Sequence, residues 1–197
     1  MRVLIACEYS GRTREAFRAR GHEVKSCDLL PSEDNSPHHI VGDVFDVIRD
    51  YGPFDLMVAH PPCQFLANSG VRWLHTDPSR WDRMREGAAF FMRLLNVDIP
   101  KIVVENPIPH KHAGLPPYSQ VVQPYHFGEY ASKATCLWLK GLPLLRPTND
   151  VGEAMRAMPK SLTHQVHRAS PGPDRWKERS RTYQGIADAF ADQYGAV

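Results

Sequence analysis

The stretch "RVLIACEYSGRTREAFRARGHEVKSCD" (residues 2–28) decides the fold. It opens with a short apolar run typical of a buried strand, turns at Ser10 and Gly11, and continues as a helix-like segment. A second strand begins with "EVKSCD" (residues 23–28). A strand, a helix and a second strand in this order form the unit from which parallel sheets are built. The stretch therefore predicts the first unit of an α/β fold.

The same alternation continues along the chain. "IVGDVFDVIRDYG" (residues 40–52) has the pattern of a strand end followed by a short helix, and "FDLMVAH" (residues 54–60) is a strongly apolar strand. "DPSRWDRMREGAAFFMRLLNV" (residues 77–97) predicts a long amphipathic helix, and "IPKIVVEN" (residues 99–106) predicts the next strand. Repeated units of this kind predict a mostly parallel sheet covered by helices on both faces.

The pattern changes after Pro107. "QVVQPYHFG" (residues 120–128) and "KATCLWLKG" (residues 133–141) predict two strands that pair antiparallel at one edge of the sheet. "YQGIADAFADQYG" (residues 183–195) predicts a closing helix. Between them, residues 142–173 are rich in proline, serine, threonine and histidine, so we expect a loop or lid there with one short helix.

Length and composition narrow the class of protein. A chain of 197 residues is long enough for one core and too short for two, so residues 1–197 are expected to form a single domain. A net charge of +2 is small for a protein that coats nucleic acid. The arginines in "GRTREAFRAR" (residues 11–20) are interpreted as a solvated helix face, with a nucleic-acid-binding patch as the alternative.

No apolar run approaches the length of a membrane span, and the opening residues turn polar too soon for a secretory signal. We therefore expect a cytoplasmic protein without membrane contact. The 4 cysteines lie far apart, and none of the 10 histidines belongs to a set with metal-ligand spacing. Reduced thiols and no metal site are expected.

Polar side chains stand where the predicted strands end. In open parallel sheets, ligands bind outside the carboxyl ends of the strands, near the point where the strand order reverses. The sequence therefore predicts one functional edge that is assembled from separate segments. Its members are Cys7 with Glu8, Asp28, Asp43, residues 60–64, and Glu105 with Asn106.

Cys63 lies in "VAHPPCQFLANSG" (residues 58–70), directly after two prolines at a strand end. A thiol held there is suited to nucleophilic attack at fixed geometry, whereas the other three cysteines have apolar neighbours and are interpreted as buried hydrophobic residues. Glu105 ends the apolar run "KIVVE" (residues 101–105). Burial beside a second polar group is expected to raise the pKa of Glu105 and let it act as an acid or hydrogen-bond donor.

Asp28 and Asp43 follow the second and third predicted strands, where carboxylates bind the ribose hydroxyls and the adenine amine of nucleotide cofactors. The turn "CEYSGRTR" (residues 7–14) has a single glycine, whereas a dinucleotide fingerprint needs three. NAD is therefore disfavoured, and a smaller nucleoside ligand fits better.

These segments resemble the cytosine-C5 methyltransferase family. "PPCQFLANSG" (residues 61–70) is similar to the family's Pro-Pro-Cys-Gln nucleophile motif, and "VVENP" (residues 103–107) is similar to its Glu-Asn-Val motif. "VLIACEYSGRTREAFRARGHEV" (residues 3–24) resembles the opening cofactor motif, and "IVGDV" (residues 40–44) the segment that contacts adenine. The whole chain also resembles small phage-type members, which implies a bacterial or phage-infected cell.

The resemblance implies a Rossmann-like fold that binds S-adenosylmethionine. Cys63 would add to C6 of cytosine, Glu105 would hold N3 and the exocyclic amine, and Asn106 would support that geometry. The implied cofactor-binding residues are Glu8, Ser10, Gly11, Asp28, Asp43, His60 and Pro61. The candidate substrate-binding residues are Pro62, Gln64, Asn68, Arg72, Lys133, Arg179 and Arg181.

The departures from the family pattern leave the substrate open. His60 stands where a glycine is common, Ala67 replaces a serine that meets the nucleic-acid backbone, and Pro107 replaces a valine. There is also no room for a target recognition domain. Cytosine in DNA is then expected with short specificity, as a single strand, or with a partner protein. A free nucleotide such as dCMP is one alternative, and a non-catalytic protein that binds the cofactor or nucleic acid is another.

Overall fold

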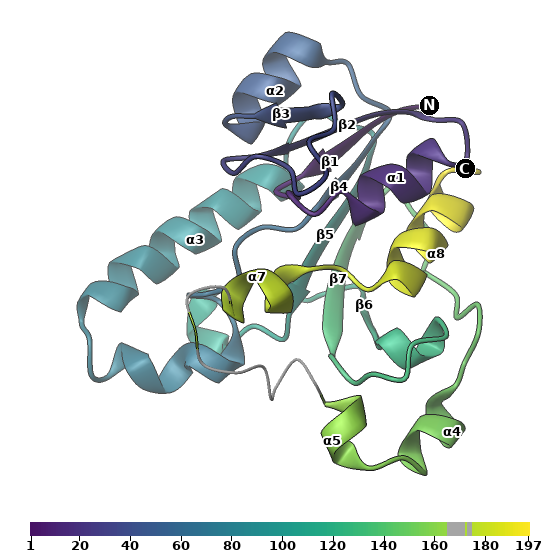
Figure 1. Cartoon of the computed structure of the whole chain (residues 1–197). Coiled ribbons are helices and arrows are strands. Elements are labelled where there is room, and N and C mark those ends of the chain that lie inside the picture. Colours follow the sequence, from purple (N-terminus) through teal and green to yellow (C-terminus); the bar gives the residue numbers. More distant parts are fainter. Residues whose placement is uncertain (165–171, 173–174) are drawn as a thin grey trace.

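The computed structural model describes residues 1–164, 172 and 175–197. Within these residues, one sheet of seven strands forms the centre of the molecule, in the order β3-β2-β1-β4-β5-β7-β6 (Figure 1). The strand bounds are β1 (Arg2–Ala6), β2 (Glu23–Asp28), β3 (His39–Val41), β4 (Leu56–Ala59), β5 (Lys101–Pro107), β6 (Gln120–Val122) and β7 (Thr135–Lys140).

The sheet is mixed in direction. Strands β3, β2, β1, β4 and β5 are parallel, whereas β7 is antiparallel to both β5 and β6. In the register of β5 with β7, Glu105 faces Leu137. This arrangement confirms the predicted α/β fold with a mostly parallel sheet and an antiparallel pair of strands at one edge.

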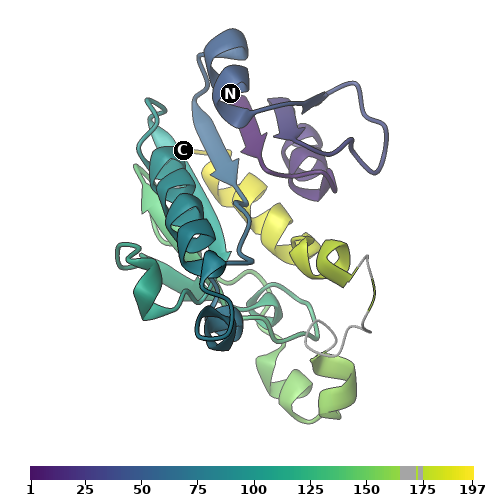
Figure 2. The same cartoon turned by 90° about the vertical axis from the view of Figure 1, so that its left-hand side faces the viewer.

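Helices cover both faces of the sheet. α1 (Arg12–Arg18) packs beside α8 (Gln184–Tyr194) on one face, while α2 (Val44–Tyr51) and α3 (Ser79–Leu95) pack on the other (Figures 1 and 2). Each central strand is buried on both sides, because successive side chains point to opposite faces. In β1, for example, Val3 and Ile5 join the core under α1 and α8, and Leu4 and Ala6 join the core under α2 and α3.

Shorter helices occupy the connections. These are η1 (Asn68–Leu74), η2 (Lys111–Ala113), η3 (Pro124–His126), α4 (Gly152–Arg156), α5 (Lys160–Thr163) and α7 (Arg175–Ser180). Within the predicted loop or lid over residues 142–173, α4 is the expected short helix and α5 is an additional one. Residues 165–171 and 173 of that region lie outside the described residues. A closing motion of the region remains a prediction.

None of the helices in the described part of the chain combines the length and apolar character needed to cross a membrane.

Candidate active site

The predicted functional edge exists in the structure. Cys7 follows β1, Asp28 ends β2, Asp43 follows β3, His60 follows β4, and Glu105 lies near the end of β5. These strands are parallel, so their carboxyl ends meet at one edge of the sheet. β1 lies between β2 and β4, and the strand order therefore reverses beside it. This is the position at which open α/β sheets bind ligands.

A cavity of about 110 Å³ opens at the ends of β1, β2 and β3. Its walls are mostly apolar, with two carboxylates among them. The lining includes Cys7, Asp28, Asp43, Val44, Pro62 and Phe90. Leu29 also lines the cavity and is 77% exposed, so a large apolar side chain stands at its solvent side. Apolar walls with a few polar groups are typical of small-molecule sites.

Backbone hydrogen bonds fix the two carboxylates of the cavity. Asp28 Oδ1 accepts from the Leu30 amide at 3.0 Å, and Asp43 Oδ1 accepts from the Phe45 amide at 2.7 Å as the N-cap of α2. Burial raises the pKa of Asp28, although the Leu30 and Leu29 amides oppose this effect. The sequence placed both residues correctly at strand ends. Their contact with a cofactor remains a prediction.

Glu8, Ser10 and Gly11, which were predicted to lie along the cofactor, build the turn between β1 and α1. The buried Glu8 carboxylate accepts from the amides of Thr13 at 2.7 Å and Arg14 at 3.2 Å, and it therefore holds the start of α1. Gly11 has φ of 75°, and a Cβ there would lie 2.3 Å from Arg14 Nη2. Only glycine fits this position without strain.

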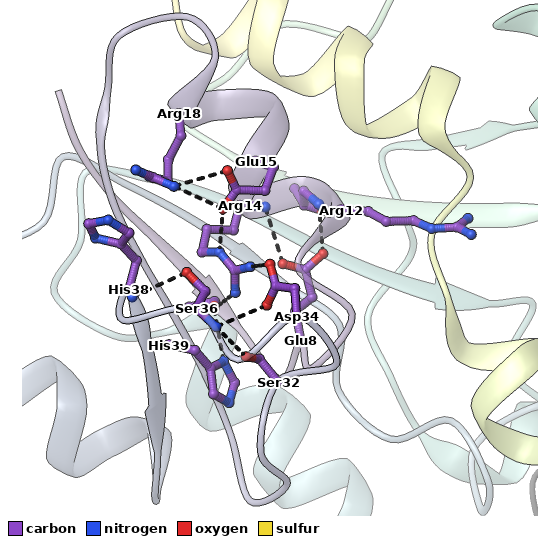
Figure 3. A network of polar contacts seen from close by, with 12 residues as sticks. Glu8, Arg12, Arg14, Glu15, Arg18, Ser32, Asp34, Ser36, His38 and His39 are labelled. Atoms are coloured by element: carbon purple, nitrogen blue, oxygen red, sulfur yellow. Dashed lines mark hydrogen bonds and ion pairs between the residues drawn. The ribbon is translucent and has the colours of Figure 1, made fainter.

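Arg14 is fully buried, contrary to the interpretation of "GRTREAFRAR" as a solvated face. It pairs with Asp34 and donates through Nη1 to Ser26 Oγ at 2.9 Å (Figure 3). Ser26 Oγ in turn bonds His39 Nδ1 at 2.9 Å, and His39 Nε2 donates to the Leu30 carbonyl at 2.9 Å. The network ties the loop after Asp28 to α1. Neither the patch nor the solvated face describes this arginine, because it is buried against Ser26 of β2 and Asp34 of the loop after β2.

Cys63 interacts electrostatically with the predicted acid. It lies, partly buried, in the loop after β4. Burial and the negative charge of Glu105 raise the pKa of the Cys63 thiol, while the positive charges of Lys133 and Arg179 oppose that rise. The pKa of the thiol therefore lies above its usual value, and the two cations limit the rise. These interactions relate four of the predicted catalytic and substrate-binding residues to one another.

Glu105 is almost fully buried and hydrogen-bonded to His60, with 3.1 Å between Glu105 Oε2 and His60 Nδ1. Burial by itself would raise the pKa of Glu105. The His60 hydrogen bond and the charges of Lys133 and His60 outweigh that effect, and the pKa lies below its usual value. The predicted rise is therefore wrong, because the second polar group is a hydrogen-bond donor and stabilises the carboxylate.

Asn106 positions the loop that carries the thiol. It is 1% exposed, and its Nδ2 donates to the Pro61 carbonyl at 2.9 Å. Its buried Oδ1 has no hydrogen-bond partner among the described residues. The chain before Cys63 is thus restricted by two proline rings and, at Pro61, by a hydrogen bond from a residue of β5. These restraints fix the backbone that leads to the thiol.

His60 and Pro62 make contacts that their sequence motif did not predict. His60, predicted with the cofactor, contacts Glu105, Thr13 and Thr182 through its ring. Pro62, predicted with the substrate, lines the cavity that holds Asp28 and Asp43. The buried Pro61 carries the carbonyl that Asn106 binds. The roles of these residues toward cofactor and substrate remain predictions.

The basic candidates separate into two groups. Lys133 Nζ donates to the Arg179 carbonyl at 3.0 Å, so both lie near Cys63. Arg181 instead pairs with Glu33 at 2.5 Å, and Arg72 lies over the ring of Trp73 with 4.6 Å to its centroid. Gln64, Asn68 and Arg72 are exposed on the segment that follows the thiol.

Sequence reasoning missed Leu29, Phe90, Thr13 and Thr182 as site residues. A leucine directly after a strand-end aspartate was an available signal for Leu29. The others had none, since their roles come from long-range packing. Within the described ranges, no group of three histidine, cysteine, aspartate or glutamate side chains is arranged to hold a metal ion.

No family model and no curated protein matches the sequence. Solved structures do match. One described as a DNA modification methyltransferase encoded within an E. coli prophage has a TM-score of 0.51 at 16% identity, over 75% of this chain and 51% of that chain. The Entamoeba histolytica methyltransferase EhMeth matches with a TM-score of 0.47 at 13% identity, over 76% of this chain and 57% of that chain. A mutant of Spodoptera frugiperda DNMT2 matches with a TM-score of 0.43 at 13% identity, over 87% of this chain and 60% of that chain.

The chain thus has the Rossmann-like fold of methyltransferases. It spans about half the length of the prophage protein that it resembles. At this identity the likeness establishes the fold alone, and the reaction has to be argued from the site.

Proposed function

We propose that this protein transfers a methyl group from S-adenosylmethionine to C5 of cytosine in DNA. One observation carries the proposal. Cys63 interacts electrostatically with Glu105 and with two cations, Lys133 and Arg179, at the strand-end edge that also holds the cavity with Asp28 and Asp43. A thiol, an acid and a nucleoside cavity at one edge are the groups that this reaction requires.

The cavity suits the adenosine part of the cofactor. Phe90, Val44 and Leu29 offer apolar surface for the ring, and Asp28 and Asp43 offer carboxylates for its hydroxyls and amine. S-adenosylmethionine, when bound, would supply the methyl group from its sulfonium. Pro62 borders this cavity and directly precedes Cys63, so the cofactor and the nucleophile would be neighbours.

The chain's own residues support each chemical step. Lys133 and Arg179 lower the pKa of Cys63 against the opposing effects of burial and Glu105. In its thiolate form Cys63 bonds to C6 of the base and makes C5 nucleophilic. Asn106 binds the carbonyl of Pro61, two residues before Cys63. This contact limits the directions from which the sulfur can attack the base. Glu105 holds N3 and the exocyclic amine. After C5 is methylated, loss of the C5 proton to water allows the bond between sulfur and C6 to break.

Two observations favour DNA as substrate. The exposed Gln64, Asn68 and Arg72 follow the thiol along the chain and can meet a nucleic-acid strand, and the prophage protein of the same fold is described as acting on DNA. A cytosine in duplex DNA would have to flip out of the stack to reach the partly buried sulfur. A free nucleotide such as dCMP is the second candidate, since Lys133 and Arg179 could bind its phosphate beside Cys63.

A tritiated-methyl transfer assay tests the proposal. Duplex DNA, single-stranded DNA and dCMP are offered in parallel to the wild-type protein and to Cys63→Ala, with Cys136→Ala as the matched thiol control. Label in the C5 position of DNA cytosine, lost only in Cys63→Ala, is the expected result. Label in dCMP alone would shift the proposal to a nucleotide enzyme. Bound cofactor without any transfer would contradict catalysis.

A further inference from the structure

His60 occupies a built position beside the acid. It follows β4, and its Nδ1 lies 3.1 Å from Glu105 Oε2 in β5 and 3.4 Å from Thr182 Oγ1 ahead of α8. Its Nε2 lies 3.4 Å from Thr13 Oγ1 in α1. The His60 and Glu105 side chains are 7% and 11% exposed. Three segments therefore enclose the ring, and its carboxylate partner is the proposed acid.

These contacts allow two protonation states of the imidazole. An ionised carboxylate only accepts hydrogen bonds, so His60 Nδ1 must carry a proton toward Glu105. The Thr13 hydroxyl can accept from His60 Nε2, so the ring can hold a proton on each nitrogen. When Nδ1 passes its proton to the carboxylate, the carboxyl group donates to Nδ1 in turn, and the contact between them is kept.

We propose that His60 is the positioning residue of Glu105 and the source of the proton that Glu105 gives to the base. The inference rests on the proposed function. By engaging Oε2, His60 leaves Oε1 of Glu105 for the substrate. Glycine is common at this position in the family that the sequence resembles. It has no side chain, so it could neither position Glu105 nor supply a proton.

The proton balance closes over one cycle. Glu105 begins ionised, so its Oε2 first takes the proton of His60 Nδ1, and His60 becomes neutral. Rotation of the carboxyl group turns this proton toward the base, and as Cys63 bonds to C6 the electrons move to N3, which takes the proton and leaves Glu105 ionised. When the bond between sulfur and C6 breaks, N3 returns the proton along the same route. The pair ends as it began.

Charged groups on the surrounding elements act on the pair. Lys133, ahead of β7, favours ionised Glu105. Glu8, at the end of β1, binds the Thr13 amide at 2.7 Å, and Arg12 of α1 donates to the Thr182 carbonyl at 2.9 Å. The pH dependence of the reaction therefore belongs to this group of residues and not to His60 alone.

Kinetics of His60→Asn and His60→Ala across pH test the inference. Asparagine keeps a donor near Nδ1 but cannot give up a proton, so kcat at neutral pH should fall about 100-fold with little change in KM. In His60→Asn, activity should also start to fall at a lower pH than in the wild type, because the proton must then come from the Glu105 carboxyl group alone, which is protonated only at low pH. His60→Ala should lose kcat further. His22→Asn, at the opposite edge of the sheet, should match the wild type.

An unchanged pH profile in His60→Asn, or an equal loss at every pH, would overturn the inference. A second readout needs no activity. By NMR, the His60 Nδ1 proton should exchange slowly in the wild type and in Cys63→Ala, and rapidly in Glu105→Ala. Rapid exchange in the wild type would contradict the contact. A wild type that methylates neither DNA nor dCMP would refute the proposed function, while the NMR result would still report on His60 and Glu105.

Discussion

The two halves of the functional edge are built differently. At the ends of β1, β2 and β3, carboxylates bind nearby backbone: Glu8 holds the start of α1, Asp43 caps α2, and Asp28 binds the following turn. At the ends of β4 and β5, Cys63 and Glu105 interact with side chains far away in sequence. In the first half, which we call the cradle, the carboxylates bind backbone close to them in sequence, although Arg14 behind them is held by the more distant Asp34. In the second half, which we call the cluster, the members alter each other's pKa values.

The largest effect is expected from a substitution that removes the acid of the cluster. Glu105→Gln keeps the shape but cannot give a proton to N3, so kcat for methyl transfer should fall about 1,000-fold. Cofactor affinity should stay within about twofold, because the cradle is separate. Transfer assays and calorimetric titration with S-adenosylhomocysteine measure the two quantities. A loss of affinity comparable with the loss of kcat would show that the halves are one unit.

The next largest effect is expected on stability, from a substitution of Arg14 behind the cradle. Arg14→Met removes a fully buried guanidinium whose partners Asp34 and Glu15 are partly exposed. The free energy of unfolding should fall by about 2 kcal/mol, from lost charged hydrogen bonds that solvent partly screens. Urea denaturation measures this change, and Arg18→Met on the exposed side of the same helix serves as control. Equal small effects in both variants would show that burial of Arg14 contributes nothing.

A smaller effect is expected for Asp28→Asn. Loss of one charged hydrogen bond to the cofactor should weaken its binding about 10-fold, with kcat at saturating cofactor nearly unchanged. Titration of cofactor affinity checks the first part, and saturation kinetics the second. If affinity is unchanged, the cavity at β2 is not the adenosine site, and the separation between cradle and cluster loses its functional meaning.

The smallest effect is a shift in thiol reactivity. Glu105 raises the pKa of the Cys63 thiol and Lys133 lowers it. Alkylation of Cys63 by iodoacetamide should therefore begin at lower pH in Glu105→Gln and at higher pH in Lys133→Met. Mass spectrometry at a series of pH values follows this reaction at Cys63, while the buried Cys27 provides an internal reference. Shifts of the opposite sign would show that other groups control the thiol.

The contrast between the halves also explains what the sequence could predict. The strands were readable because runs such as residues 54–60 are apolar throughout, and strand-end aspartates could be placed from their neighbours alone. The burial of Arg14 and the lowered pKa of Glu105 could not be predicted from neighbouring residues. Arg14 pairs with Asp34, 20 residues away, and Glu105 with His60, 45 residues away. Local patterns determine elements, and the tertiary fold determines the charge state of the site.

Trapping the covalent adduct tests the central claim most directly. In DNA that contains 5-fluorocytosine, the C5 substituent cannot leave as a proton, so the bond between the sulfur and C6 should persist after methyl transfer. With S-adenosylmethionine present, the wild type should form a complex that resists denaturation, and the modified peptide should contain Cys63. Cys63→Ala should form none. A wild type that methylates DNA without any trapped complex, or a complex through another residue, would contradict the account.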